Sequence, residues 1–81
     1  MTFKEVKAYV KVNPIAALWV DYNSGRDTRY RIVYNYDDGQ SIIGYVRPVT
    51  AVLLLRGGFF DANNPAYESE YTVVYRVKEQ P

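Results

Sequence analysis

The chain has 81 residues, which is enough for one domain and too few for two, so residues 1–81 are taken as a single domain. It contains no cysteine and no histidine, which excludes disulfides and the nucleophilic triads that need those side chains, and argues against a transition-metal site. Ten basic residues against nine acidic ones give a net charge of +1. The total charge therefore gives no support to non-specific nucleic-acid binding, which usually rests on a clear basic excess.

No segment of the sequence is suited to crossing a membrane. The N-terminal residues interrupt their apolar side chains with charges, unlike a signal peptide. The longest apolar run, residues 49–55, is far shorter than the roughly 20 residues needed to span a bilayer. We therefore expect a cytoplasmic protein with no membrane partner.

The first element is open to two interpretations. Residues 6–12 alternate between apolar and polar side chains, and several of them are β-branched or aromatic, which favours a strand. Thr2 and Glu5 also fit a capping box, and Val6 and Val10 lie near one face of a helix. We expect the strand, with an N-terminal helix as the alternative.

The middle of the chain carries the pattern of a hairpin and of a strand before it. Trp19 lies in a β-rich segment, and the segment after it alternates sharply between two sets of side chains. Asp38-Gly39 is typical of a tight turn, because glycine readily adopts positive φ angles. Pro48 is expected to end the last of these strands. The expected strands are residues 15–22, 29–36 and 40–47, with turns at 23–25 and 37–39.

The C-terminal half predicts one ambiguous segment, one loop and one clear strand. Residues 49–56 fit either a buried strand or a two-turn helix ended by glycines. Residues 59–66 have the composition of a loop. Residues 70–78 alternate as an antiparallel strand with one face on a core and the other in water.

Together these elements predict an all-β fold, a small antiparallel barrel or sandwich of five to six strands. The alternative is an α+β fold with a short helix at 49–56 or at the N-terminus.

The residues that remain for catalysis are carboxylates, and their positions have simpler explanations. Asp37 and Asp38 fit the hairpin turn, and Glu68 and Glu70 share the solvent face of a strand. There is no phosphate-binding loop of the GxxxxGK type and no calcium-binding loop spacing. We therefore expect a protein that is not an enzyme and that has no cofactor and no metal.

Tyrosine and arginine are the unusual feature of the composition. Nine tyrosines supply most of an aromatic content of 16%, and arginines stand beside them repeatedly. Both residue types are enriched where proteins bind one another. We expect a binding module that acts through protein–protein contact, either by self-association as a homodimer or as a small adaptor or inhibitor that covers a site on a larger partner. The expected contact residues are Arg29, Arg31, Tyr45 and Arg47 on the central hairpin, with Phe59 and Phe60 of the exposed loop as a second group.

The alternative function is single-stranded nucleic-acid binding, by tyrosine stacking on bases and arginine contacts to phosphates. Neighbouring residues of a strand point to opposite faces, so Arg31 and Tyr30 cannot share a surface within one strand, whereas Tyr45 and Arg47 do. This geometry favours a structural role for many of the tyrosines. The tyrosines expected to line a core or its margin are Tyr30, Tyr34, Tyr36, Tyr71 and Tyr75.

Overall fold

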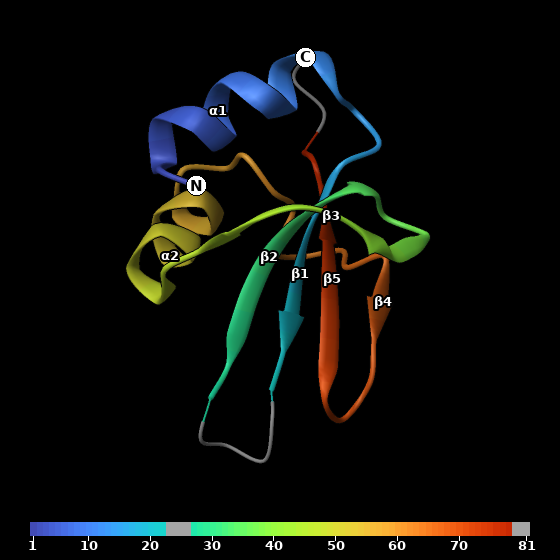
Figure 1. Cartoon of the computed structure of the whole chain (residues 1–81). Helices are drawn as coiled ribbons and strands as arrows, with labels where there is room; N and C mark the ends of the chain where they lie inside the picture. Colours follow the sequence, from blue (N-terminus) through green and yellow to red (C-terminus); the bar gives the residue numbers. More distant parts are fainter. Residues whose placement is uncertain (23–26, 79–81) are drawn as a thin grey trace.

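The computed structural model describes residues 1–22 and 27–78, so the turn expected at 23–25 lies outside the described residues. A five-stranded antiparallel sheet in the order β3-β2-β1-β5-β4 is combined with two helices (Figure 1). The elements are α1 (Phe3–Val12), β1 (Ala17–Asp21), β2 (Arg29–Asn35), β3 (Asp38–Val46), α2 (Pro48–Arg56), β4 (Tyr67–Glu68) and β5 (Thr72–Arg76).

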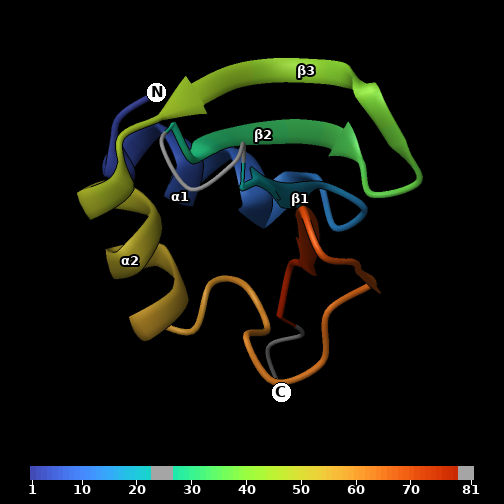
Figure 2. The same ribbon diagram turned by 90° about the horizontal axis from the view of Figure 1, so that it is seen from below.

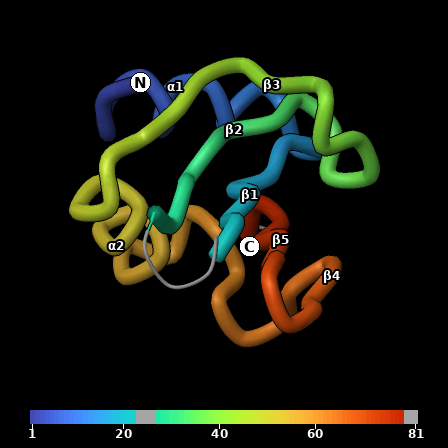
Figure 3. The backbone as a smooth tube through the Cα atoms, turned by 60° about the horizontal axis from the view of Figure 1, so that its bottom comes forward, coloured from blue at the N-terminus to red at the C-terminus, as the bar shows by residue number. Residues whose placement is uncertain are grey.

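The chain is therefore a mixed α+β protein. The sheet is open, with β3 and β4 at its opposite ends (Figure 3), and along it the strands β3, β2, β1 and β5 follow one another in an arc (Figure 2). The expectation of an all-β barrel or sandwich is wrong, and the α+β alternative fits, with a helix at both of the places it named.

A reciprocal capping box between Thr2 and Glu5 stabilises the start of helix α1. The backbone N–H of Glu5 donates to Thr2 Oγ1 at 3.2 Å, and the backbone N–H of Thr2 donates to Glu5 Oε1 at 2.9 Å. Val6 and Val10 are buried one turn apart, whereas Val12 is exposed. The valines that suggested a strand also fit a helical face, and the capping box decides between the two.

Helix α2 starts at Pro48, whose fixed φ angle suits the first helical position. The proline thus ends β3, as expected, and also begins the next element. The helix ends at Gly57, whose backbone N–H donates to the carbonyl oxygen of Leu53 at 2.8 Å. Ala51 and Leu54 point into the core.

The central strand β1 is packed on both of its faces. Leu18 lies opposite Ile32 and Tyr75 on the face that the helices cover, and Trp19 lies opposite Arg31 and Val74 on the other, which we call the outer face. The main core, on the helix-covered face, consists of Val6, Val10, Leu18, Val20, Ile32, Val46, Ala51, Leu54 and Phe60. A second, smaller cluster on the outer face consists of Ala17, Val33 and Val74, packed against Trp19, Tyr36 and Ala66.

The tyrosines fall into two groups. Tyr30 and Tyr75 pack against the main core and Tyr36 against the outer cluster, as expected of residues at the margin of a core. Tyr34 and Tyr71 are exposed, so the expectation is wrong for these two. For Tyr34 the physical reason is the irregular pairing of β2 with β3 next to it, which breaks the simple alternation.

The β2–β3 hairpin also turns at a different place from the expected one. The turn residues are Tyr36 and Asp37, and Gly39 lies within β3. Among the described glycines, positive φ occurs at Gly58 and not at Gly39. The glycine of the Asp38-Gly39 pair therefore does not serve the conformation of a turn.

Candidate functional site

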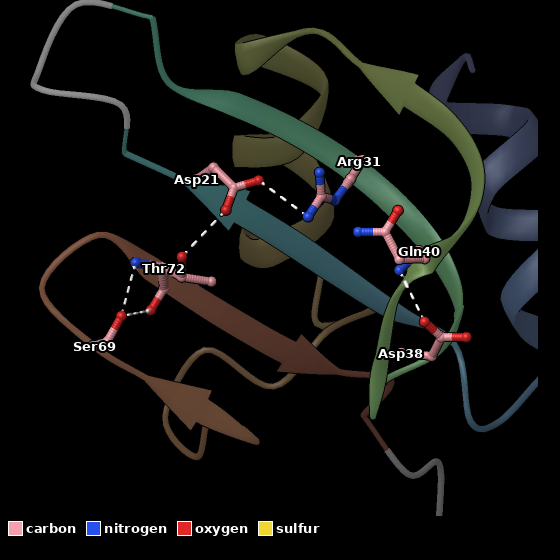
Figure 4. A network of polar contacts seen from close by, with 6 residues as sticks. All are labelled: Asp21, Arg31, Asp38, Gln40, Ser69 and Thr72. Carbon is pink, nitrogen blue, oxygen red and sulfur yellow. Dashed lines mark hydrogen bonds and ion pairs between the residues drawn. The ribbon is translucent and has the colours of Figure 1, made fainter.

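Arg31 is held on the outer face by an aromatic ring and a carboxylate. Its guanidinium carbon lies 5.4 Å from the ring centroid of Trp19, and its Nη2 atom lies 3.3 Å from Asp21 Oδ2. Thr72 Oγ1 donates to the other carboxylate oxygen of Asp21 at 3.2 Å, so three strands contribute to this network (Figure 4). Arg31 is thus a well-anchored group rather than a freely moving surface cation.

Cross-strand pairing brings three of the expected contact residues together. Tyr45 of β3 lies directly opposite Arg31 of β2, and Arg29 lies opposite Asp21. Arg29 and Tyr45 are exposed. Alternation within one strand separates arginines from tyrosines, but two neighbouring strands can place them side by side on one face. The outer face therefore does combine arginine and tyrosine.

Tyr45 and Arg47 line a shared hollow of about 610 Å³ between the start of α1, the end of β3 and the start of α2. The N-terminal ammonium of Met1 donates to the carbonyl oxygen of Tyr45, and the Met1 side chain lies over Gly44. The open edge of β3 is therefore covered at Tyr45, which leaves less of it for pairing with another chain.

The second expected group, Phe59 and Phe60, is not an exposed pair. Phe60 is 1% exposed, belongs to the main core and bridges to Val77. Phe59 is half-buried, with its ring 5.5 Å from that of Phe3 in an edge-on arrangement and with Lys7 Nζ 5.8 Å from its centre. Phe60 is not accessible to a partner in this position, because its side chain is buried in the main core.

Helix α2 carries an exposed apolar surface that was not predicted from the sequence. Val49, Val52 and Leu53 are 64%, 42% and 50% exposed, and their spacing of three and four residues places them on one side of the helix. We call these three residues the α2 stripe. The apolar run at 49–55 could have indicated this surface. In a helix, one buried face cannot contain all of these side chains, so some of them must be exposed.

The carboxylates are placed as turn and surface groups. Asp38 Oδ1 accepts from the backbone N–H of Gln40 at 2.9 Å, and Glu68 and Glu70 are exposed.

Three groups within the described ranges have shifted pKa values. Hydrogen bonds from the backbone and the side chain of Thr2 lower the pKa of Glu5. Burial raises the pKa of Tyr9 and of Tyr75 above their ordinary values. Across residues 1–22 and 27–78, no cluster of three or more carboxylates is arranged to hold a metal ion.

Neither helix in the described part of the chain is long and apolar enough to cross a membrane. Comparison with known proteins gives no match: no protein-family model, no curated protein and no solved structure is significantly similar to this chain.

Proposed function

We propose that this chain is a non-enzymatic binding module that acts through protein–protein contact, and that the α2 stripe is the centre of the contact. One observation carries the proposal: α2 is apolar on both sides. Ala51 and Leu54 fill the core, and the α2 stripe faces outward with no charged side chain between Pro48 and Leu55. A helix that is apolar all round is normally buried on all sides, and a partner would complete that burial.

The energy available from the α2 stripe is of the right size for an anchor. Full burial of a valine or leucine side chain contributes about 1.5–3 kcal/mol, and these three are roughly half covered already. Covering the rest would contribute about 1 kcal/mol for each residue. Tyr45 and Arg47, which line the neighbouring hollow, are of the residue types that dominate binding energies at interfaces.

The charges around the α2 stripe favour an acidic partner. No acidic residue occurs from Gly39 to Phe60, and Arg47 and Arg56 stand at the two ends of α2. Two copies packed α2 against α2 would bring arginines near arginines, which is unfavourable. A larger protein with an apolar groove bordered by carboxylates would match both features. The chain would then act as an adaptor or inhibitor that covers this groove.

Site-specific crosslinking tests the proposal. A photo-reactive phenylalanine analogue replaces Val52 in one variant and Val12, an exposed valine of α1, in the matched control. In an extract of the cells that naturally make the chain, we expect an adduct from position 52 and none from position 12. We further expect Arg47→Glu together with Arg56→Glu to remove the adduct, because the reversed charges would repel an acidic partner.

The outcomes separate the possibilities. An adduct that survives the double charge reversal would overturn the acidic partner, and an adduct between two copies of the chain would replace it with self-association through the same stripe. A chain that sediments as a monomer and gives no specific adduct from position 52 would overturn protein binding at α2.

A second function, single-stranded nucleic-acid binding, is favoured by the pairing of Arg31 with exposed Tyr45 on the outer face. Two other rings of that face, Trp19 and Tyr36, already carry guanidinium groups from Arg31 and Arg76, which leaves less ring surface for bases. A labelled oligonucleotide that binds at about 50 mM salt, and binds less well to Tyr45→Ala, would support this function. No binding at that salt concentration would eliminate it.

A further inference from the structure

A groove of about 930 Å³ lies at the end of α1, away from the α2 stripe. Several separate segments border it: the last turn of α1, the β2–β3 turn, the loop after Phe60, and the end of β5. The polar side chains that line it are Lys11, Tyr36, Asp61, Asn64, Arg76 and Lys78.

Backbone hydrogen bonds fix the segments that carry these side chains. The N–H of Tyr36 donates to the carbonyl oxygen of Ile15 at 2.9 Å, and the N–H of Asp61 donates to that of Arg76 at 2.9 Å. The N–H of Lys78 donates to the carbonyl oxygen of Phe59 at 3.0 Å. The walls of the groove are thus held in position without a ligand, which reduces the entropy lost on binding.

The groove is electropositive. Among the described residues that line it, the three cations Lys11, Arg76 and Lys78 outnumber the single carboxylate of Asp61 by two. Asp61 Oδ1 is already occupied, because it accepts from the backbone N–H of Asn63 at 3.1 Å. Within residues 1–22 and 27–78 the one ion pair joins Arg31 and Asp21, so none of the three cations forms an ion pair with a described carboxylate.

Arginine and an aromatic ring are placed together inside the groove. The guanidinium carbon of Arg76 lies 4.8 Å from the ring centroid of Tyr36, which restrains both side chains. A guanidinium group so held can direct two parallel N–H donors at a phosphate, which a lysine cannot do.

We propose that this groove binds a phosphate-bearing ligand of about the size of a nucleotide. A phosphate group carries close to two negative charges at neutral pH, which matches the charge excess of the groove. The volume lies at the upper end of the range of small-molecule sites, about 300–1,000 Å³. Asn64 offers further hydrogen-bond donors and acceptors beside the cations.

Calorimetric titration tests the proposal. A salt concentration of about 150 mM is used because charges farther away than about 8 Å are then largely screened, so that the measured binding reports the groove itself. The probes are adenosine triphosphate, inorganic pyrophosphate and adenosine. We expect the two phosphate compounds to bind and adenosine not to bind. Arg76→Gln and Lys11→Gln should each weaken binding by about tenfold, the loss expected for a charge-assisted hydrogen bond.

Lys4→Gln is the matched control, since it removes the same charge from the exposed side of α1 outside the groove, and it should change affinity by less than about twofold. Circular dichroism verifies that each variant is folded. Equal losses from Lys4→Gln and Lys11→Gln, or no binding of either phosphate compound at millimolar concentration, would overturn the proposal.

A ten-nucleotide single strand identifies the source of the phosphate. If it competes with adenosine triphosphate and binds more tightly, the groove holds the backbone of a nucleic acid. If adenosine triphosphate binds at least as tightly, the ligand is a free nucleotide. Val52→Glu should leave phosphate binding unchanged, so this site and the protein contact at the α2 stripe succeed or fail independently.

Discussion

Gly39 lies directly against the indole ring of Trp19: a Cβ atom placed on Gly39 would be 2.9 Å from Cζ2 and 3.0 Å from Cη2 of the ring. Strand β3 thereby passes over Trp19 and helps to close the small cluster on the outer face. The glycine is needed for space, because its φ angle lies outside the left-handed region.

Gly39→Ala should lower the free energy of unfolding by about 1–3 kcal/mol, since the added methyl group must displace a large ring that is packed on its other side. Gly44→Ala is the control. A Cβ there would be 2.7 Å from Cγ of Met1, but that side chain is flexible and can move. We expect Gly44→Ala to cost clearly less, as measured by urea unfolding. Equal losses from the two variants would contradict this explanation of Gly39.

Substitutions on the two sides of α2 should change the free energy of unfolding by very different amounts. Val52→Glu should change the free energy of unfolding by less than about 0.5 kcal/mol, because the side chain is exposed in the isolated chain. Leu54→Ala should lower it by about 2–5 kcal/mol, because Leu54 is fully buried. Thermal and urea unfolding measure both. A large loss from Val52→Glu would mean that the α2 stripe already serves the fold and is not a surface kept for a partner.

The capping box of α1 predicts a dependence of stability on pH. Hydrogen bonds from Thr2 lower the pKa of Glu5 below its ordinary value of 4.5, so the folded state binds a proton at Glu5 less readily than the unfolded state does. Its contribution is therefore present above the unfolded pKa and is lost as the pH falls through the folded pKa. The difference in unfolding free energy between the native chain and Glu5→Gln should be larger at neutral pH than at about pH 3.

Thr2→Ala removes the other half of the same box. It should lower the free energy of unfolding by about 1 kcal/mol at neutral pH and raise the pKa of Glu5 toward its ordinary value. Nuclear magnetic resonance titration of the Glu5 carboxyl carbon measures the second effect. Part of the lowering should remain, because the backbone N–H of residue 2 still donates to Glu5 Oε1 in this variant. An unchanged pKa in Thr2→Ala would show that the Thr2 hydroxyl does not contribute to the lowering.

The pair Asp21–Arg31 should contribute to stability in a measurable way. Its side chains are 30% and 20% exposed, so the pair is more shielded from water than an ordinary surface ion pair. A double-mutant cycle with Asp21→Asn and Arg31→Gln should give a coupling energy of about 1 kcal/mol. The matched cycle uses Arg29, which lies opposite Asp21 in the sheet without an ion pair to it. A coupling for Arg29 as large as that for Arg31 would contradict the assigned pairing.

Strand positions in the middle and at the end of the chain were predictable from the sequence, because Ile32, Val33 and their neighbours are β-branched or aromatic residues in short runs. The expected strands 15–22, 29–36, 40–47 and 70–78 correspond to β1, β2, β3 and β5. The helices were harder. In α1, the valines among residues 6–12 fit both the two-residue period of a strand and the 3.6-residue period of a helix. Only the capping box of Thr2 and Glu5 favoured the helix over the strand.

Contacts between strands explain most of what the sequence could not show about the candidate site. Arg31 meets Tyr45 only because β2 and β3 pair in one particular register, and Arg76 meets Tyr36 only across the outer face. Phe60 could be recognised as a loop residue by its neighbours, but its burial depends on how that loop returns to Val77. Local sequence patterns predict secondary structure, whereas a site depends on contacts between segments that are far apart in the sequence.

The two dissimilar interiors on either side of β1 have a consequence for how the strand is aligned. A slip of one residue would carry Trp19 beneath the helices and turn Leu18 toward Gly39. Neither space has the shape of the incoming side chain, since one is built for a branched aliphatic group and the other for a flat indole. Packing on both faces of β1 thus opposes a shift of the strand. This fixes the register in which β1 pairs with β2 and with β5.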